Sequence, residues 1–165
     1  MGKMMKINNC QERVFAATVD ELAALVADFD RVWPTEITAA PRQVGRRLYR
    51  AGIMVWEEFD RPGATRAFRV VSPEGLQAEH WFNLEHIDEG VRLRHTIAGE
   101  AVGEYETVWC EQIEPTHGRV FAALFDRIET ALGRSAGTDS SLRPAEARSS
   151  LRDAYQRVQC HGNDW

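Results

Sequence analysis

Two histidines lie at alternating positions inside apolar segments, and of all residues in this sequence they have the pattern best suited to chemistry. His80 alternates with Phe82 and Leu84, and His95 alternates with Leu93 and Ile97. If both segments are strands, each histidine shares a face with its apolar neighbours. A buried imidazole stays neutral at pH 7, because burial disfavours its charged form. It can then anchor a ligand hydroxyl or act as a base. The alternative is a structural, hydrogen-bonded histidine.

The turn between the two segments decides whether these histidines meet. Asp88, Glu89 and Gly90 have turn chemistry. With a two-residue turn, we expect His80 and His95 to be directly opposed. With a three-residue loop the register shifts and this pairing fails. The sequence leaves both arrangements open.

Other titratable residues have weaker patterns. Glu58 and Asp60 have the spacing at which two carboxylates share a strand face and form an acid/base pair. They adjoin a surface turn, however, which favours two solvated charges. His117 follows Pro115 by two residues, and we interpret it as an exposed histidine in the first turn of a helix.

Several classes of function have no support in the sequence. There is no phosphate-binding glycine loop, no nucleophile elbow and no ordered set of metal ligands. We therefore assign no catalytic residue and expect neither a metal nor a cofactor. The net charge of −5 argues against a nucleic-acid partner. Cys10, Cys110 and Cys160 are far apart and indicate free thiols. Without an apolar run of membrane length or a secretory signal, we expect no membrane span and a cytoplasmic location.

Changes in the period of apolar residues predict the elements that position these side chains. Residues 8–16 have the pattern of a first strand. Thr18 and Glu21 have the capping-box spacing, which predicts a helix to about Ala27. A second short helical turn should end before Pro34, because the residue preceding a proline is disfavoured in helices.

The middle of the chain has the period of strands. Turn residues separate its segments, so we expect hairpins and an antiparallel meander. Gly52 marks a place where a long strand can bend or split. The predicted strands are 36–43, 46–60, 65–72, 77–87 and 91–99.

A helical period returns after residue 103 and continues to Gly133, a suitable C-terminal stop. Pro115 lies inside this stretch and removes one backbone hydrogen bond, at a cost of about 3 kcal/mol. We expect one bent helix or two stacked helices, with the bend or restart between Glu111 and His117.

This order of elements resembles the SRPBCC superfamily, which includes START lipid-transfer domains, birch-pollen-allergen-like proteins and a bacterial polyketide cyclase/dehydrase-like branch. The resemblance covers about residues 8–133. It does not extend to the tail, and the helix contains a proline where many relatives look unbroken. The residues that support it are the segment from Val14 to Leu22, Trp33, the segment from Glu58 to Pro62, the segment from Trp81 to Leu93, and Pro115-Thr116-His117.

The resemblance implies an α+β helix-grip fold, with two short helices after the first strand and a curved antiparallel sheet around a long C-terminal helix. We expect residues 1–133 to form the ligand-binding domain. Residues 134–165 should form a flexible linker and tail, in which Pro144 can open a short helix. The fold implies an internal cavity, with Trp56, Phe82 and Trp109 among its lining. Core packing is the alternative role for each aromatic residue. The candidate ligand-binding residues are Trp33, Trp56, Phe68, His80, Phe82, His95, Tyr105 and Trp109.

Three functions fit this prediction. The first is a carrier or sensor of a small, mostly apolar molecule, such as a lipid, a polyketide or an aromatic metabolite. The second is a cyclase/dehydratase-like enzyme that uses a pocket histidine or carboxylate. The third is a protein-binding domain of the chaperone-cofactor kind, which needs only an exposed apolar patch. The lack of a catalytic constellation favours the first function, and the oligomeric state stays open.

Overall fold

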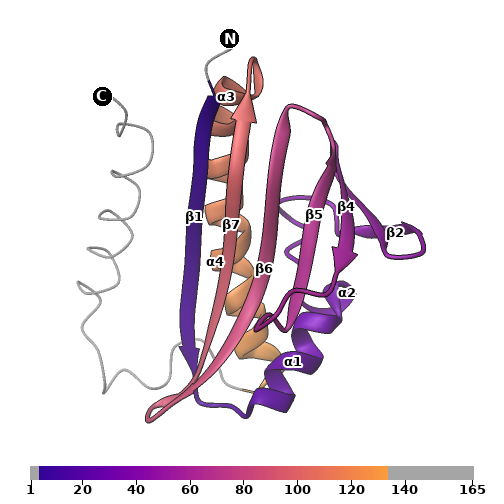
Figure 1. Cartoon of the computed structure of the whole chain (residues 1–165). Helices are drawn as coiled ribbons and strands as arrows, with labels where there is room; N and C mark the ends of the chain where they lie inside the picture. The colour runs from indigo at the N-terminus through magenta and orange to yellow at the C-terminus, as the bar shows by residue number, and fades with distance from the viewer. Residues whose placement is uncertain (1–3, 134–165) are drawn as a thin grey trace.

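A computed structural model describes residues 4–133 as one antiparallel sheet with helices on one face (Figure 1). The sheet has seven strands in the order β1-β7-β6-β5-β4-β3-β2, so the first and last strands of the chain are neighbours. In chain order the elements are β1 (Met4–Phe15), α1 (Val19–Ala27), α2 (Phe29–Val32), β2 (Arg42–Gly45), β3 (Leu48–Ala51), β4 (Met54–Phe59), β5 (Arg66–Ser72), β6 (Leu76–Ile87), β7 (Gly90–Val102), α3 (Tyr105–Val108), the π-helical turn η1 (Trp109–Ile113) and α4 (Glu114–Ala131).

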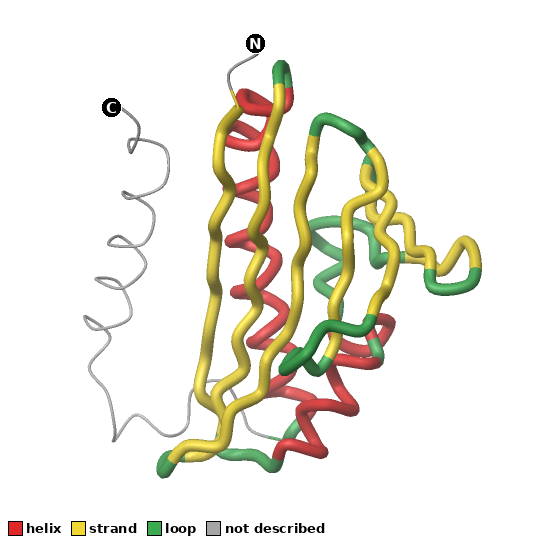
Figure 2. Tube along the Cα trace, in the orientation of Figure 1, coloured by secondary structure: helices red, strands yellow, loops and turns green. Residues whose placement is uncertain are grey.

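This architecture confirms the predicted α+β helix-grip fold. β2 to β7 form a meander of consecutive antiparallel strands, and β1 closes the order beside β7. The long helix runs behind β1, β7 and β6, as Figure 2 shows in red behind the yellow strands. The hydrophobic core fills the space between this helix, α1, α2 and the inner face of the sheet.

The start of α1 is fixed by its predicted capping box. The Thr18 hydroxyl accepts a hydrogen bond from the Glu21 amide at 3.2 Å, and the Glu21 carboxylate accepts one from the Thr18 amide at 2.8 Å. Two of the free amides at the helix start are satisfied in this way. The short α2 ends at Val32, and Trp33, its C-cap, has an extended backbone directly before Pro34, as predicted.

The strands differ from the prediction mainly at the far edge of the sheet. The predicted strand 36–43 is wrong over most of its length, because residues 35–38 form turns and β2 covers Arg42–Gly45. The predicted strand 46–60 is split into β3 and β4. Gly52 lies at the split with φ 59°, a backbone conformation that glycine adopts without strain. The possible split at Gly52 is thus confirmed.

The proline in the long helix is accommodated by a π-helical turn. The Glu114 amide donates to the carbonyl of Trp109, five residues back, and α4 then begins with Pro115 in its first turn. Proline is tolerated there, because first-turn amides have no partner within the helix. The change from π-helix to α-helix falls inside the predicted interval, but the helix is continuous from Tyr105 to Ala131, so two separate stacked helices do not form.

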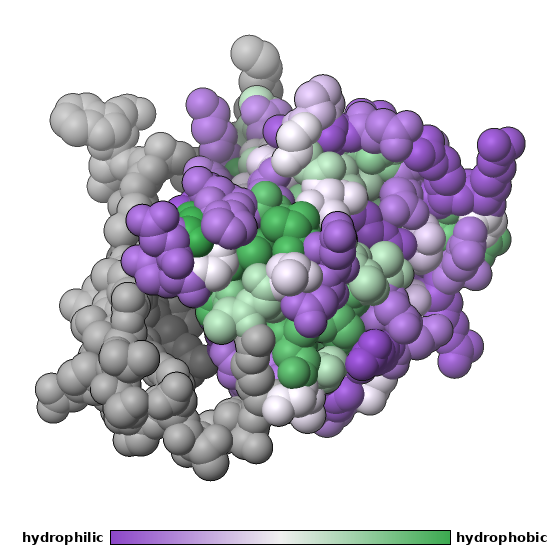
Figure 3. Space-filling view, turned by 90° about the horizontal axis from the view of Figure 1, so that it is seen from below, coloured by the Kyte–Doolittle hydropathy of each residue, from purple (hydrophilic) through white to green (hydrophobic). Residues whose placement is uncertain are grey.

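Seen from the end at which α1 lies, the surface has hydrophobic residues at its centre and hydrophilic residues around them (Figure 3). Among the described helices, none has the length and hydropathy needed to cross a membrane.

The predicted linker and tail at 134–165 lie outside the described residues, so the proposed boundary at residue 133 stays a prediction.

Gly99 of β7 permits the close approach of β6, and this contact generates a stability prediction. A Cβ added at Gly99 would clash with the carbonyl oxygen of Gln77 and come within 2.5 Å of the Ala78 Cα. We expect Gly99→Ala to lower the free energy of unfolding in urea by about 1–3 kcal/mol. The control is Gly45→Ala, whose added Cβ would meet Leu48 at 3.4 Å. It should change this free energy by less than about 1 kcal/mol. Equal effects of the two substitutions would contradict the close approach.

Candidate functional site

The pairing of β6 with β7 brings His80 and His95 together. Ile87 pairs with Gly90, so Asp88 and Glu89 form a two-residue turn. The predicted direct opposition is nevertheless wrong, because the residue opposite His80 lies equally far beyond the turn, at Ile97.

His95 pairs with Phe82, so the two histidines are diagonal neighbours on the inner face of the sheet. Their side chains still meet, because diagonal residues on one face remain within reach of long side chains. Nδ1 of His80 lies 3.2 Å from Nε2 of His95 in a buried hydrogen bond.

A third histidine joins this pair from α4. His117 lies with its ring centroid 5.0 Å from that of His95, and both rings contact Phe121. The prediction of an exposed His117 is wrong. The residue as a whole is half-buried, but both of its ring nitrogens are shielded from solvent. We refer to His80, His95 and His117 as the histidine cluster.

The missed histidine had a signal in the sequence. His117 and Phe121 have helical i, i+4 spacing, and Leu124 and Ile128 continue the same buried face of α4. The position of His117 after a proline suggested a solvated helix start. The π-helical turn η1 instead joins the first turn of α4 to α3 without a break. As a result, His117 faces the core.

Aromatic rings surround the histidine cluster. Trp56 lies edge-on to His80 with a centroid distance of 4.3 Å, and Phe68 stacks on His80 at 5.0 Å. Phe82 contacts His95 at 4.7 Å. Phe121 stacks on His95 at 3.8 Å with an interplanar angle of 15°. The cluster therefore lies in an almost entirely apolar and aromatic environment.

Five buried nitrogens at this site have no hydrogen-bond partner among the described residues. They are Nε1 of Trp56, Nε2 of His80, Nδ1 of His95 and both ring nitrogens of His117. Each unsatisfied buried polar group costs about 1–3 kcal/mol. Buried polar groups in proteins normally have a hydrogen-bond partner, either from the protein or from an ordered water.

Burial keeps the cluster uncharged. It lowers the pKa of His80 to about 3, with smaller contributions from His117 and Arg66, and it lowers the pKa of His117 to about 3. The pKa of His95 also lies well below its usual value, first because of burial and then because of the other two histidines. At pH 7 each ring therefore has one N–H donor and one bare acceptor nitrogen.

The hydrogen bond between His80 and His95 fixes what their free nitrogens offer. One ring donates through its N–H and the other accepts. The donating ring then has a bare acceptor at its far nitrogen, and the accepting ring has a free N–H there. The two outer nitrogens of the pair, Nε2 of His80 and Nδ1 of His95, therefore always offer one donor and one acceptor. These roles are exchanged in the alternative arrangement, in which the other ring donates the hydrogen bond between them. A ligand with both hydrogen-bonding functions fits either arrangement.

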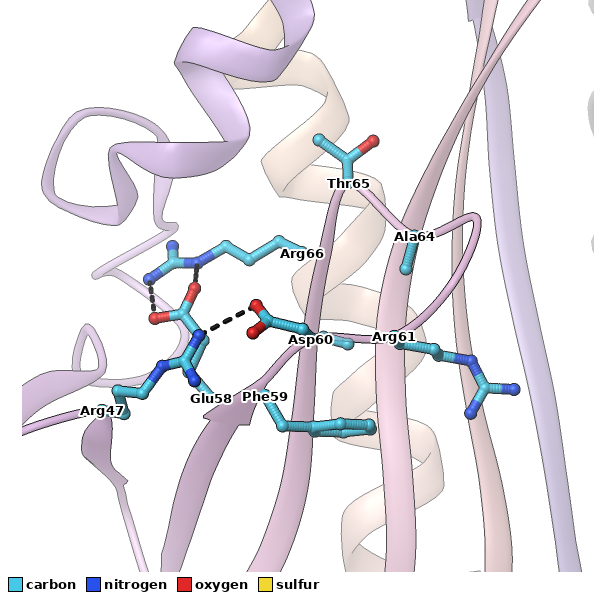
Figure 4. Close-up of a pocket in the computed structure, with 9 residues that line it drawn as sticks. Arg47, Glu58, Phe59, Asp60, Arg61, Ala64, Thr65 and Arg66 are labelled. Carbon is cyan, nitrogen blue, oxygen red and sulfur yellow. Dashed lines mark hydrogen bonds and ion pairs between the residues drawn. The ribbon is translucent and has the colours of Figure 1, made fainter.

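Arg66, whose charge contributes to the lowered pKa of His80, is neutralised within the fold. Arg66 pairs with Glu58 at 2.7 Å (Figure 4). Its guanidinium lies over the rings of Phe29 and Phe68. It also donates to the carbonyl of Val26, near the end of α1, at 3.2 Å. Arg66 thus closes one end of the aromatic interior and leaves no free charge there.

Glu58 and Asp60 do not form the acid/base pair that the sequence permits but disfavours. Glu58 binds Arg66, whereas the Asp60 side chain is 92% exposed and pairs with Arg47. These four residues line a small hollow of about 150 Å³ at the surface. The predicted solvation holds for Asp60, whereas Glu58 is held in an ion pair with the largely buried Arg66.

Six of the eight predicted ligand-binding residues are linked to one another by ring contacts in the core, and their role in binding stays a prediction. Trp33 contacts Trp56, and its indole N–H donates to the Thr38 carbonyl at 3.2 Å. Tyr105 and Trp109 belong to the same hydrophobic core but are outside this set of ring contacts. Trp109 is buried but makes no ring contact with the cluster among the described residues, and Tyr105 packs beside Gly75. The six are Trp33, Trp56, Phe68, His80, Phe82 and His95.

The predicted internal cavity remains a prediction. One hollow lies at the surface near Arg66, and a second lies at β5 and β6 on the outer side of the sheet. Neither is lined by Trp56, Phe82 or Trp109. Within residues 4–133, no group of three or more histidine, cysteine or acidic side chains is placed to hold a metal ion.

Comparison with solved structures supports the fold at low sequence identity. The protein CalU16 from Micromonospora echinospora matches with a TM-score of 0.55 and 15% identity, over 95% of this chain and 98% of its own. The protein of unknown function SA2116 from Staphylococcus aureus matches with a TM-score of 0.57 and 9% identity, over 80% and 99% of the two chains.

One domain of a larger protein is also similar. The di-domain ARO/CYC protein StfQ from the steffimycin biosynthetic pathway matches with a TM-score of 0.54 and 9% identity, over 78% of this chain and 53% of StfQ. No protein-family model matches the sequence. No curated protein matches it significantly. At these identities the likenesses show the fold alone, and they support the predicted helix-grip fold.

The low pKa values of the cluster predict how stability depends on pH. The unfolded chain protonates a histidine near pH 6.5, whereas folded His80 and His117 do so only near pH 3. Between these values the unfolded state binds more protons, so stability is full above pH 6.5 and falls as the pH is lowered. Each such histidine contributes a slope of about 1.4 kcal/mol per pH unit.

We expect His80→Phe to reduce this slope between pH 6 and 4 by about 1.4 kcal/mol per pH unit, measured by urea unfolding. The matched control is His86→Phe, at an exposed position of the same strand. Unchanged slopes in His80→Phe would show that His80 titrates equally in the folded and unfolded states.

Proposed function

We propose that this protein binds a small, neutral, aromatic molecule with a hydroxyl or carbonyl group at the histidine cluster, as a carrier or sensor. The observation that carries this proposal is the set of five buried, unpartnered nitrogens of Trp56 and the histidine cluster. A core kept only for stability would be better served by apolar side chains of similar size, because a half-satisfied polar network costs more than an apolar core.

The electrostatics of the site favour an uncharged ligand. Burial keeps the histidines neutral, and Arg66 is already paired with Glu58. A carboxylate or phosphate in this interior would lose its hydration without meeting a free positive charge. An alcohol, phenol, enol or ketone needs only hydrogen bonds, and the His80–His95 pair offers one donor and one acceptor.

The surrounding rings favour a flat, apolar ligand body. Aromatic faces and edges of Trp56, Phe68, Phe82 and Phe121 surround the histidines. Burying about 300 Å² of apolar ligand surface contributes about 7 kcal/mol. Association costs at least about 4 kcal/mol, so apolar contact alone gives weak binding. Two or three hydrogen bonds of about 1 kcal/mol each then move the affinity toward the micromolar range.

The same pair supports a second candidate, a cyclase/dehydratase-like enzyme. The bare nitrogen at one end can take a C–H proton from a β-hydroxy ketone, while the N–H at the other end protonates the departing hydroxyl. The C–O bond breaks, water leaves, and the electron pair of the C–H bond forms the new double bond. The shared proton then lies in the alternate position. Loss of water from a β-hydroxy ketone with wild-type protein, but not with His80→Phe, would favour this enzyme over a carrier.

The binding proposal is tested with 2-naphthol, a fluorescent aromatic alcohol, titrated against the full chain. His80→Phe and His95→Phe should each raise its Kd by about 5- to 150-fold, because one anchor is lost and its partner is left unsatisfied. The exposed His86→Phe is the matched control and should bind as the parent does. 2-Methylnaphthalene, which lacks the hydroxyl, should bind more weakly to the parent and equally to all variants.

Two outcomes would refute the proposal. In the first, 2-naphthol binds the folded histidine variants as tightly as it binds the parent. In the second, the alcohol has no advantage over its methyl counterpart. Either would assign the histidines a structural role, and the pattern expected for that role is lower melting temperature with unchanged binding.

A further inference from the structure

The hydrogen-bonded ladder between β5 and β6 ends halfway along these strands. The pairing runs from Arg66 opposite Phe82 to Arg69 opposite Glu79 and stops there. Residues 70–72 and 76–78 remain strands, paired with β4 and β7 on their other sides, but not with each other. Figures 1 and 2 show β5 and β6 separating toward the turn that joins them. We refer to this interval as the split.

Two local features explain the split. In the pairing of β4 with β5, Val55 lies opposite Ser72 and Trp56 opposite Val70, so Val71 is the extra residue of a β-bulge. A bulge bends its strand and increases the local twist. On the other side, Gly99 lets β7 lie unusually close to residues 77 and 78 of β6. Thus β5 bends while β6 is held against β7.

A hollow of about 580 Å³ lies at the split, within the size range of pockets that hold small molecules. Its rim has charged and aromatic side chains. Glu79 forms ion pairs with Arg61 at 2.7 Å and with Arg69 at 3.1 Å. The Arg61 guanidinium also lies over the Trp81 ring. Ala98 and Gly99 of β7 line the other side of the hollow.

The floor of this hollow belongs to the core that holds the histidine cluster. Val70 and Ala78 line the hollow and are 8% and 4% exposed. Val70 pairs with Trp56, whose ring contacts His80, and Ala78 precedes His80 by two residues on the same face of β6. One layer of side chains therefore separates the hollow from the cluster. Both side chains in that layer are smaller than the aromatic residues around them.

We infer that the split between β5 and β6 is the entrance by which an aromatic ligand reaches the histidine cluster, an inference that rests on the proposed function. Elsewhere the ladders of this sheet are continuous between β6 and β7 and between β7 and β1. Passage there would break many backbone hydrogen bonds. At the split no ladder bonds have to break, and only small side chains need to move.

An entrance has a kinetic signature that a binding subsite lacks. Blocking an entrance slows association and dissociation by the same factor and leaves Kd unchanged, because the bound and free states are untouched. We therefore fill the hollow by Ala98→Trp, whose position is on the outer face of β7 and outside the histidine cluster. Stopped-flow fluorescence with 2-naphthol should show both rate constants reduced by about tenfold or more, with Kd within about twofold of the parent.

The matched control is Val14→Trp, an exposed apolar position on the outer face of β1 away from the hollow. It should leave both rates unchanged. A second test closes the split itself. In a chain with Cys10, Cys110 and Cys160 replaced by alanine, Val71→Cys and Gln77→Cys are joined by a short bis-maleimide, and the same protein is measured before and after joining.

The results separate this inference from the proposed function. Histidine-dependent binding with unchanged rates in folded Ala98→Trp, or in the cross-linked chain, would overturn the entrance and leave the site intact. A changed Kd with unchanged association would make the hollow a binding subsite and would also overturn the entrance. Binding of 2-naphthol that does not depend on His80 and His95, or no binding at all, would overturn the proposed function and the entrance with it.

Discussion

The site depends on the register between β6 and β7. A two-residue turn sets Ile87 against Gly90, and this one pairing determines that His80 and His95 lie as diagonal neighbours on the inner face. Because side chains alternate between faces, a slip of one residue would turn one of these histidines to solvent. The register is held by a long ladder, from Leu76 opposite Ala101 down to the turn. α4 completes the site by packing His117 and Phe121 against His95.

The aromatic environment makes this arrangement chemically selective. Charged imidazoles are disfavoured there, so the cluster keeps donors and acceptors without keeping charge. Arg66 forms an ion pair with Glu58 and donates a hydrogen bond to a carbonyl near the end of α1. The fold therefore separates two tasks. Paired charges close the end of the interior, and neutral nitrogens inside it remain available for a neutral partner.

Much of the fold follows from local rules in the sequence. The capping box at Thr18, the strand period of β5 to β7 and the turn at Asp88 need only nearest-neighbour chemistry. The alternation of apolar residues along each strand predicts that His80 and His95 face the core. Their diagonal contact depends on the register of β6 against β7, which the length of the turn sets. His117 was misassigned because the proline suggested a break, whereas the backbone widens into a π-helical turn. The alternation of apolar and polar residues does not predict the split between β5 and β6. The bulge at Val71 that causes it arises only from the pairing of β4 with β5.

The central claim is that the neutral nitrogens of the histidine cluster anchor a ligand. Nitrogen-detected NMR of the imidazole side chains tests this most directly, because the shifts of Nδ1 and Nε2 report protonation and hydrogen bonding for each ring separately. With 2-naphthol added at pH 7, the free nitrogens of His80 and His95 should shift together, with one becoming a stronger donor and the other a stronger acceptor. The exposed His86 should stay unchanged. Imidazole shifts of the cluster that do not respond to the alcohol, or rings that are charged at pH 7, would contradict the account.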